Sequence, residues 1–293
     1  MLIGYSSPVY SATLVGDGAD WLNDDGPDTL SDNKPSSVAR IQWVSGSSPE
    51  AITDYVEIRL VWAVSFAPRV LAFLGASLEA GVKLEVYGRA EGEETFDTAL
   101  GGNGLTQDTV EFPDQSIGAF FVFAENAESC NGVAIRVYND LDGVVWATSS
   151  SYFDVGEIVV QPAVDVPLAH GAEYQLEDPT IRSRTIGSQL VEVTRTPFRK
   201  ISFEISPQID ADHYASGLTN SMDMQKLTHR LSAGAYSILV IRWANLAGTL
   251  DTNVLQRHAI FAKVFPGATK HIDRNRTYGQ ISQQSFEAEE IPA

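Results

Sequence analysis

Apolar and polar residues alternate with a period of two along several short runs in the first half of the chain. Every second residue across 55–60 is apolar, and residues 82–86 repeat the pattern. Such alternation is typical of a strand with one face in the core and the other in solvent. Turn-forming Gly, Asn, Asp and Pro bound these runs, as expected of an antiparallel sheet. The strands predicted here are 38–44, 55–61, 69–74, 82–87, 118–123, 133–138 and 152–160.

The second half combines further strands with one amphipathic helix. Across residues 221–231, Met224, Leu227 and Leu231 fall on one helical face, which predicts a helix that packs on a core. Ser221 is the expected N-cap, because its hydroxyl can accept a hydrogen bond from the first turn. The strands predicted in this half are 190–193, 200–205, 235–243, 258–264 and 277–282.

The regular pattern is interrupted at residues 161–171, where two prolines and a glycine favour turns. A chain of 293 residues also lies near the upper limit of a single core. We therefore predict a β-sandwich domain over 1–165, a β-rich domain with one helix over 166–285, and a flexible tail over 286–293. The expected fold class is mainly β.

The chain is acidic, with 38 Asp and Glu residues against 20 Lys and Arg residues and a formal net charge of −18. No stretch gathers Lys and Arg into a stripe that would neutralise phosphates, so nucleic-acid binding is not expected. An anionic membrane would repel such a chain. The most apolar run, 61–78, contains Pro68 and Arg69, so membrane insertion is not expected either.

Two features bear on the compartment in which the protein is made. Cys130 is the only cysteine, so neither an intrachain disulfide nor a thiolate metal cluster is expected. Residues 1–8 lack the basic segment and apolar run of a signal peptide. We expect the protein to be made in a cytoplasm.

No residue spacing typical of an active site is found. The five histidines are scattered, and no serine sits in a nucleophile-elbow pattern. Residues 101–104 are rich in glycine but are not followed by the Lys and Ser or Thr of a phosphate loop. Paired carboxylates occur at 93–94 and 289–290, and the sequence leaves their spatial separation open. We expect no enzyme activity, no catalytic residue, no metal ligand and no cofactor.

An acidic, turn-rich loop at residues 16–37 is the place where the sequence suggests ligand binding. An aromatic ring beside carboxylates is how many sugar-binding surfaces stack a ring and bond its hydroxyls. The alternatives are that the tryptophans pack in the core, and that the aspartates form turns or hold a hard cation. The ligand-binding candidates are Trp21, Asn23, Asp24, Asp25 and Trp43.

The first half resembles the discoidin-like sandwich, also known as the coagulation-factor C-type domain. The resemblance is carried by the alternating run 54–60, the apolar run 67–78 with its turn, and the run 82–88, with 152–160 as the closing strand. It implies a jelly-roll type antiparallel β-sandwich whose loops at one end bind glycans or lipids. This chain lacks the cysteine pair that often ties the ends of that sandwich.

The second half is similar to the distal tail and minor tail-tip proteins of long-tailed bacteriophages. Residues 182–193 and 199–205, followed by the helix and a strand, carry this resemblance. It implies a virion structural protein, assembled in the host cytoplasm, that forms a homo-oligomeric ring. The implied partners are the tail tube, hub and tail-fibre proteins, with a host surface glycan as a further partner. Arginine outnumbers acidic residues over 182–199, so this segment is suited to an acidic surface of a neighbour.

The alternative hypothesis belongs to a different functional class. The acidic loop with its tryptophans would instead make the chain a carbohydrate-binding module or a carbohydrate-active enzyme. Hydrolysis would also require a pair of carboxylates, which the sequence alone does not identify.

Overall fold

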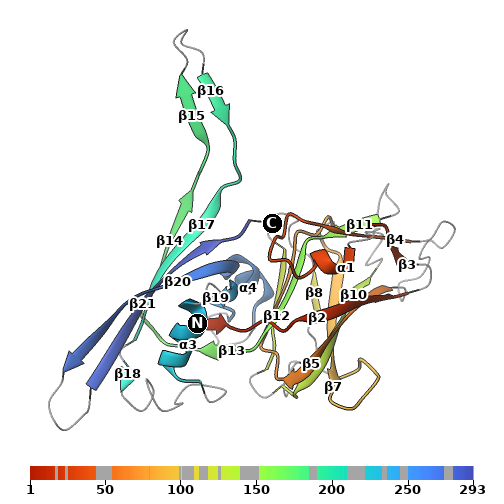
Figure 1. Cartoon of the computed structure of the whole chain (residues 1–293), viewed down its shortest axis with the longest axis horizontal. Helices are drawn as coiled ribbons and strands as arrows, with labels where there is room; N and C mark the ends of the chain where they lie inside the picture. The colour runs from red at the N-terminus through yellow and green to blue at the C-terminus, as the bar shows by residue number, and fades with distance from the viewer. Residues whose placement is uncertain are drawn as a thin grey trace. The chain divides into compact units, whose positions relative to one another are not determined.

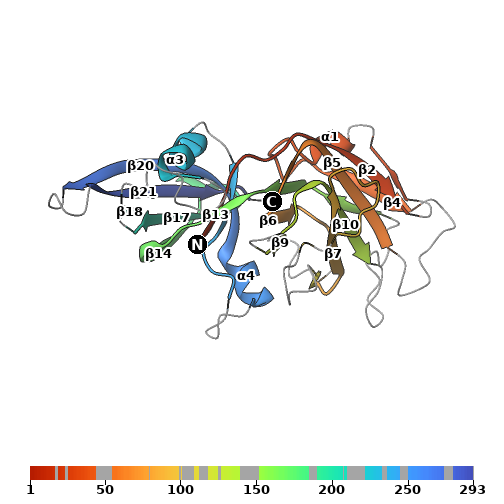
Figure 2. The same cartoon turned by 90° about the horizontal axis from the view of Figure 1, so that it is seen from below.

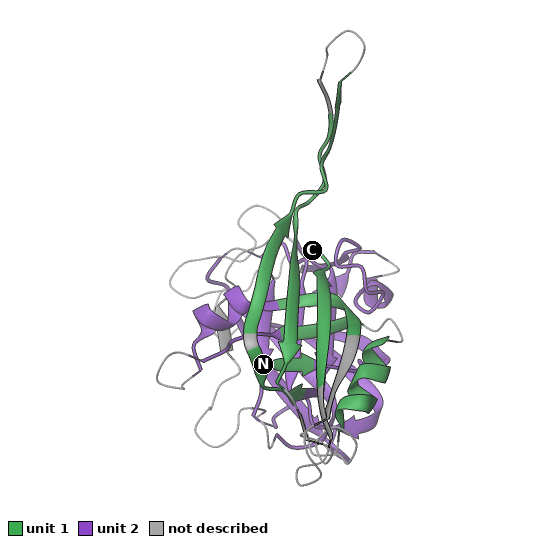
Figure 3. Ribbon diagram, turned by 90° about the vertical axis from the view of Figure 1, so that its left-hand side faces the viewer, with its two compact units in different colours: residues 1–3, 164–239, 260–292 green, residues 4–163, 240–259, 293 purple. Residues whose placement is uncertain are grey.

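The computed structural model divides the chain into two compact units (Figure 3). Residues 1–3, 164–239 and 260–292 form one of them, here called the arm-bearing unit, and residues 4–163 with 240–259 form the other, the sandwich unit. The residues that the structure describes are 1–16, 19–23, 26–43, 55–78, 80–98, 100, 109–111, 118–124, 127–138, 152–184, 190–206, 208–209, 222–232, 236–244, 250–273 and 280–292.

The sandwich unit contains three antiparallel sheets around one apolar core. Figure 2 shows several of its strands, among them β2, β5, β7 and β10. Val56, Ile58 and Leu60 point into this core from the same strand, as their alternation predicts. The five-stranded sheet has the order β2 (Tyr10–Val15), β5 (Tyr55–Phe66), β10 (Cys130–Tyr138), β7 (Lys83–Ala90) and β8 (Thr109–Glu111). The two three-stranded sheets are β11 (Tyr152–Val155), β4 (Ala39–Trp43), β3 (Ala19–Trp21) and β12 (Glu157–Gln161), β6 (Val70–Leu74), β9 (Ala119–Val122). The short helices are α1 (Gly26–Thr29) and α4 (Thr252–His258).

The arm-bearing unit is built on one large sheet (Figure 1). Its order is β13 (Ala163–Asp165), β1 (Leu2–Gly4), β19 (Tyr236–Val240), β20 (Ala259–Asp273), β21 (Gln280–Glu290), β17 (Phe198–Ile205) and β14 (Leu168–Glu177), and β18 (Gln208–Ile209) also pairs with β21. A separate two-stranded ribbon is formed by β15 (Ile181–Arg184) and β16 (Leu190–Val193). The helix is α3 (Met224–Ser232).

The predicted fold class is confirmed in that the chain is mainly β, with an antiparallel β-sandwich unit followed by a β-rich unit that carries a helix. The predicted helix is confirmed as α3, with Met224, Leu227 and Leu231 buried. Ser221 lies outside the described residues, and the side chain of Asp223 instead accepts a hydrogen bond from the backbone N–H of Lys226 at 2.6 Å.

The domain limits differ from those expected at two places in the chain. Met1–Ile3 belong to the arm-bearing unit, because β1 lies between β13 and β19 in its sheet. Residues 240–259 belong to the sandwich unit, although the sequence analysis assigns them to the second domain. Both segments are short, and their partners lie far away in the sequence, so local patterns do not reveal where they pack.

The prediction of a flexible tail over 286–293 is wrong for residues 286–290, which form the end of β21. Phe286 and Ala288 are buried, and the ring of Phe286 stacks on that of Phe203 at a centroid distance of 5.3 Å. At the end of the strand, the backbone N–H of Arg199 donates to Oε2 of Glu290 at 2.9 Å. Burial on alternate residues therefore holds this segment in the sheet despite its polar composition.

Candidate functional sites

The structure describes only some of the predicted ligand-binding residues. Trp21 and Asn23, whose side chains it describes, contact other residues of the sandwich unit. Trp21 pairs with Ile41 across β3 and β4 and packs against the sandwich core. Asn23 donates to the carbonyl of Val38 at 3.2 Å and accepts from the backbone N–H of Arg40 at 2.9 Å. Asp24 and Asp25 lie outside the described residues, and for Trp43 only the place of its backbone in β4 is described. A ligand site at these five positions stays a prediction.

The solvent-side face of the five-stranded sheet carries a polar network that the sequence analysis missed. The carboxylate of Glu57, which is 1% exposed, accepts from Nε of Arg59 at 2.5 Å and from Nε of Arg136 at 2.7 Å. The guanidinium of Arg136 lies over the ring of Tyr55 and over that of Tyr87, at 4.8 Å and 4.1 Å from the centroids. The alternating positions of Glu57 and Arg59 in the sequence indicated a polar face on this strand. They did not indicate that Arg136 on β10 would pair with Glu57.

A second carboxylate, Glu85, extends this network. Burial alone would raise the pKa of Glu85, but hydrogen bonds from Lys83, Tyr138 and Tyr87 outweigh it and hold the pKa below its ordinary value. The ammonium of Lys83 also lies 4.6 Å from the ring centroid of Tyr138. Because a cation lies over the ring of each of these tyrosines, the network acts as a packed polar layer.

The ribbon β15–β16 and the extended residues that join it to the sheet form an arm, defined here as residues 176–184 and 190–197. The arm continues β14 and β17 beyond the sheet and projects away from the body of its unit (Figures 1 and 3). Its apolar side chains are open to solvent: Leu176 is 72% exposed, and Ile181 and Val193 are each 51% exposed. All four residues of β15 are exposed. No third strand pairs with the ribbon within the described part of the chain.

Basic side chains are concentrated along the same arm. Between residues 181 and 197 the sequence holds three arginines and one glutamate, a net charge of +2 in a chain of net charge −18. Arg182 uses its Nε to bind Oε1 of Glu192 at 3.0 Å. Arg184 and Arg195 form no ion pair with any residue that the structure describes. The arm therefore presents two cationic groups that can bind an external anion.

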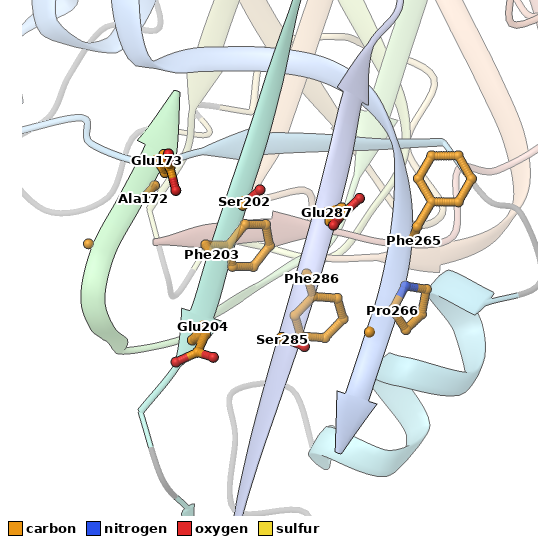
Figure 4. A pocket seen from close by; sticks show the side chains of 12 residues that line it. Ala172, Glu173, Ser202, Phe203, Glu204, Phe265, Pro266, Ser285, Phe286 and Glu287 are labelled. Atoms are coloured by element: carbon orange, nitrogen blue, oxygen red, sulfur yellow. The ribbon is translucent and has the colours of Figure 1, made fainter. Parts of the chain in front are cut away.

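An acidic hollow lies on the solvent-facing side of the arm-bearing sheet (Figure 4). Glu173, Ser202, Glu287 and Phe265 stand in one row across β14, β17, β21 and β20, because each is paired in register with the next. Glu204, two residues further along β17, adds a third carboxylate. The hollow has a volume of about 590 Å³. We call it the acidic groove.

The charges of the acidic groove are only weakly compensated. Lys200 approaches Glu287 at 3.7 Å, beyond the distance of a strong charge-assisted hydrogen bond. Glu204 accepts a hydrogen bond from the side chain of Gln283 at 2.7 Å. Glu173 has no ion-pair partner among the described residues. Phe265 is 40% exposed at the edge of the groove, next to Glu287, and the ammonium of Lys263 lies 5.7 Å from its ring centroid.

The structure adds little on metals and membranes. Among the residues it describes, no three His, Cys, Asp or Glu side chains come together as metal ligands. In the same residues, no helix has both the length and the hydropathy needed to span a bilayer.

No protein-family model and no curated protein sequence matches this chain. Solved structures give partial similarity. A pectin-binding carbohydrate-binding module has a TM-score of 0.36 and 10% identity, covering 54% of this chain and 93% of the module. The family 32 module of NanJ from Clostridium perfringens, solved with galactose, has a TM-score of 0.34 and 11% identity, covering 53% of this chain and all of the module (100%). At such scores these similarities carry no argument about function.

Proposed function

We propose that this chain is a non-enzymatic structural protein that assembles with copies of itself through the arm. The observation that carries the proposal is the exposure of Leu176, near the end of β14, and of Ile181 and Val193 on the ribbon, with which no further strand pairs among the described residues. A two-stranded ribbon alone is marginally stable in water. Large apolar side chains on such a ribbon favour a binding partner, because contact removes both the apolar surface and the open strand edges from water.

The assembly that we propose is a bacteriophage tail tip, in which this chain links the tail tube to hub or tail-fibre proteins. The similarity of residues 182–193 and 199–205 to distal tail proteins motivates this step. Mass spectrometry of virions purified from a host that carries this gene tests it. The proposal predicts the chain among the tail proteins at several copies per particle, and its absence from intact virions contradicts it.

Self-association is tested separately, by light scattering of the purified full chain after size-exclusion chromatography. Wild type is expected to form a defined oligomer, and the triple substitution Leu176→Ser, Ile181→Ser, Val193→Ser is expected to yield monomer. A matched control changes Val9→Ser and Val64→Ser, two exposed valines of the sandwich unit, and is expected to leave the oligomer intact. A wild-type chain that stays monomeric at every concentration contradicts the proposal.

Carbohydrate binding by the sandwich unit is a second candidate function. The observation in its favour is that Trp21 lies on β3, at the edge of its three-stranded sheet, and is only partly buried. The exposed part of an indole provides a stacking surface for a sugar. If this second function holds, the sandwich unit binds a surface glycan while the arm-bearing unit assembles with other copies of the chain.

A glycan array tests the second candidate with three proteins. Trp21→Ala is expected to abolish the binding seen with wild type, and Leu22→Ala, at the exposed neighbouring position, is expected to retain it. Thermal melting of Trp21→Ala separates lost binding from lost folding, since Trp21 also packs against the core. If wild type binds no glycan on the array, this candidate is removed.

A further inference from the structure

The arm and the acidic groove are complementary in charge and in chemistry. The arm presents Arg184 and Arg195, which lack ion-pair partners among the described residues. The groove presents Glu287 beside the exposed ring of Phe265, with Glu173 two strands away from Glu287 in the same row. An arginine can pair with a carboxylate and stack on an aromatic ring at the same time, so Glu287 and Phe265 suit a guanidinium better than an ammonium.

This chain already uses the same arrangement within its own fold. Arg136 binds the carboxylate of Glu57 while its guanidinium lies over Tyr55 and Tyr87. Arg40 does the same with Asp154 and the ring of Tyr152, at 4.1 Å from the centroid. The acidic groove offers the carboxylate of Glu287 and the ring of Phe265 without an arginine, and the lysines near them, Lys200 and Lys263, stay at 3.7 Å from the carboxylate and 5.7 Å from the ring centroid.

A chain cannot place its own arm in its own groove. The arm is the continuation of β14 and β17, and these strands supply Glu173 and Ser202 to the groove. Reaching back would require the ribbon to reverse its direction and to break the pairing next to Glu177 and Phe198. The ribbon instead extends away from the sheet (Figure 1), by roughly 23 Å between Glu177 and Arg184 at about 3.3 Å per residue.

We propose that the arm of one copy binds in the acidic groove of the next copy. This inference rests on the proposed self-assembly and specifies the surface that receives the arm. Each chain has one arm and one groove, so the contact is head to tail. Such a contact repeats from copy to copy and closes into a ring, or grows as a filament when the rotation does not close. The volume of about 590 Å³ accommodates a few arm side chains, while the rest of the ribbon lies over the rim.

Charge reversal of each surface tests the contact. The arm variant is Arg184→Glu with Arg195→Glu, and the groove variant is Glu173→Lys with Glu287→Lys. Each variant alone is expected to weaken self-association by about tenfold or more, because it brings like charges together. A variant that carries all four substitutions is expected to recover association. A control that reverses Glu91 and Glu93, exposed acids of the sandwich unit, is expected to behave as wild type.

Mixing the two variants gives the sharpest result. In the mixture the normal arm of the groove variant meets the normal groove of the arm variant, and the Glu-bearing arm meets the Lys-bearing groove, so both contacts are complementary in charge. The mixture is expected to form oligomers in which the two variants alternate, whereas each variant alone stays monomeric. Unchanged melting temperatures of both variants confirm that folding is intact.

The outcomes separate this inference from the proposed function. If wild type associates but the groove variant associates equally well, the arm binds elsewhere and the inference is overturned while self-assembly stands. If the mixture contains no mixed oligomer while each variant is monomeric, the head-to-tail contact is likewise refuted. A wild-type chain that never associates refutes both proposals.

Discussion

Ile181 on β15 lies directly opposite Val193 on β16, and both side chains are half exposed. Residues that face each other across an antiparallel pair point to the same side, so the two form an apolar patch on one face of the arm. Arg182 and Glu192 form the next pair and point to the opposite face. The arm therefore has an apolar face and a charged face, and both are available to a partner.

Hydrogen exchange is expected to report on the arm as the protein assembles. The amides of β15 and β16 have no strand beside the ribbon among the described residues, so they should exchange rapidly in dilute monomer. In the oligomer they should become protected, while amides of the buried strand β6 stay slow in both conditions. Protection of the arm that does not change with concentration would contradict this account of the ribbon.

Gln256 on α4 is expected to contribute strongly to the stability of the sandwich unit. Its amide accepts from the backbone N–H of Phe120 and donates to the carbonyl of Phe120, both at 2.8 Å, at the edge strand β9. Gln256→Ala leaves two buried backbone groups unpaired, at a cost of about 1–3 kcal/mol for each. Chemical denaturation measures the loss, and Gln225→Ala on the exposed face of α3 is the control, with a change within about 0.5 kcal/mol.

Glu157 makes the stability of the sandwich unit depend on pH. Its side chain is buried, and Oε2 accepts from the backbone N–H of Lys34 at 3.1 Å. Burial, with the charge of Asp32 as a smaller cause, raises the pKa of Glu157 to about 8. The folded state therefore holds a proton that the unfolded state loses near pH 4.5.

The sign of the effect follows from the raised pKa. The contribution of Glu157 to stability is complete below about pH 4.5 and is lost as the pH rises to about 8. Glu157→Gln, which stays neutral and keeps an acceptor for Lys34, should be more stable than wild type at pH 8 and nearly equal to it at pH 4. Melting curves at the two pH values measure this difference. A difference between the two proteins that does not change with pH would refute the assignment to Glu157.

The pair of Glu57 and Arg136 is expected to show strong coupling. Arg136→Ala leaves a buried carboxylate with only Arg59 as its partner, which should cost about 3 kcal/mol. The double variant Glu57→Gln, Arg136→Ala should lose less than the sum of the two single changes, because no buried carboxylate remains and the one charge left without its partner, Arg59, is partly exposed. A double-mutant cycle in urea gives the coupling energy, and additive losses would show that the two side chains act independently.

The sequence correctly predicted those strands and helices that bury one face, because burial of one face leaves a regular pattern of apolar residues. Residues 55–61 alternate because β5 has one face in the core, and the predicted helix is found as α3 because its apolar residues recur on one face. The helix α4 was missed, since its seven residues are too few for a helical period to be recognised. Polar Gln283 and Gln284 concealed β21, whose burial depends on pairing with β17 and β20.

The candidate site was harder to predict than the fold. The sequence indicated excess arginine over residues 182–199. Its pattern did not reveal that the ribbon lacks a third paired strand among the described residues. The acidic groove combines Glu173, Ser202, Glu287 and Phe265 from four strands, and only their register brings them into one row. Likewise, Glu57 and Arg136 are 79 residues apart in sequence, and the pairing of β5 with β10 unites them.

Sedimentation velocity of the full chain over a wide range of concentration tests the central claim most directly. Wild type is expected to shift from monomer to one defined larger species as the concentration rises. The substitutions at Leu176, Ile181 and Val193 are expected to keep the chain monomeric, and the Val9 and Val64 control is expected to behave as wild type. A chain that sediments as monomer throughout, or an oligomer that forms equally well with all three arm residues replaced, would contradict assembly through the arm.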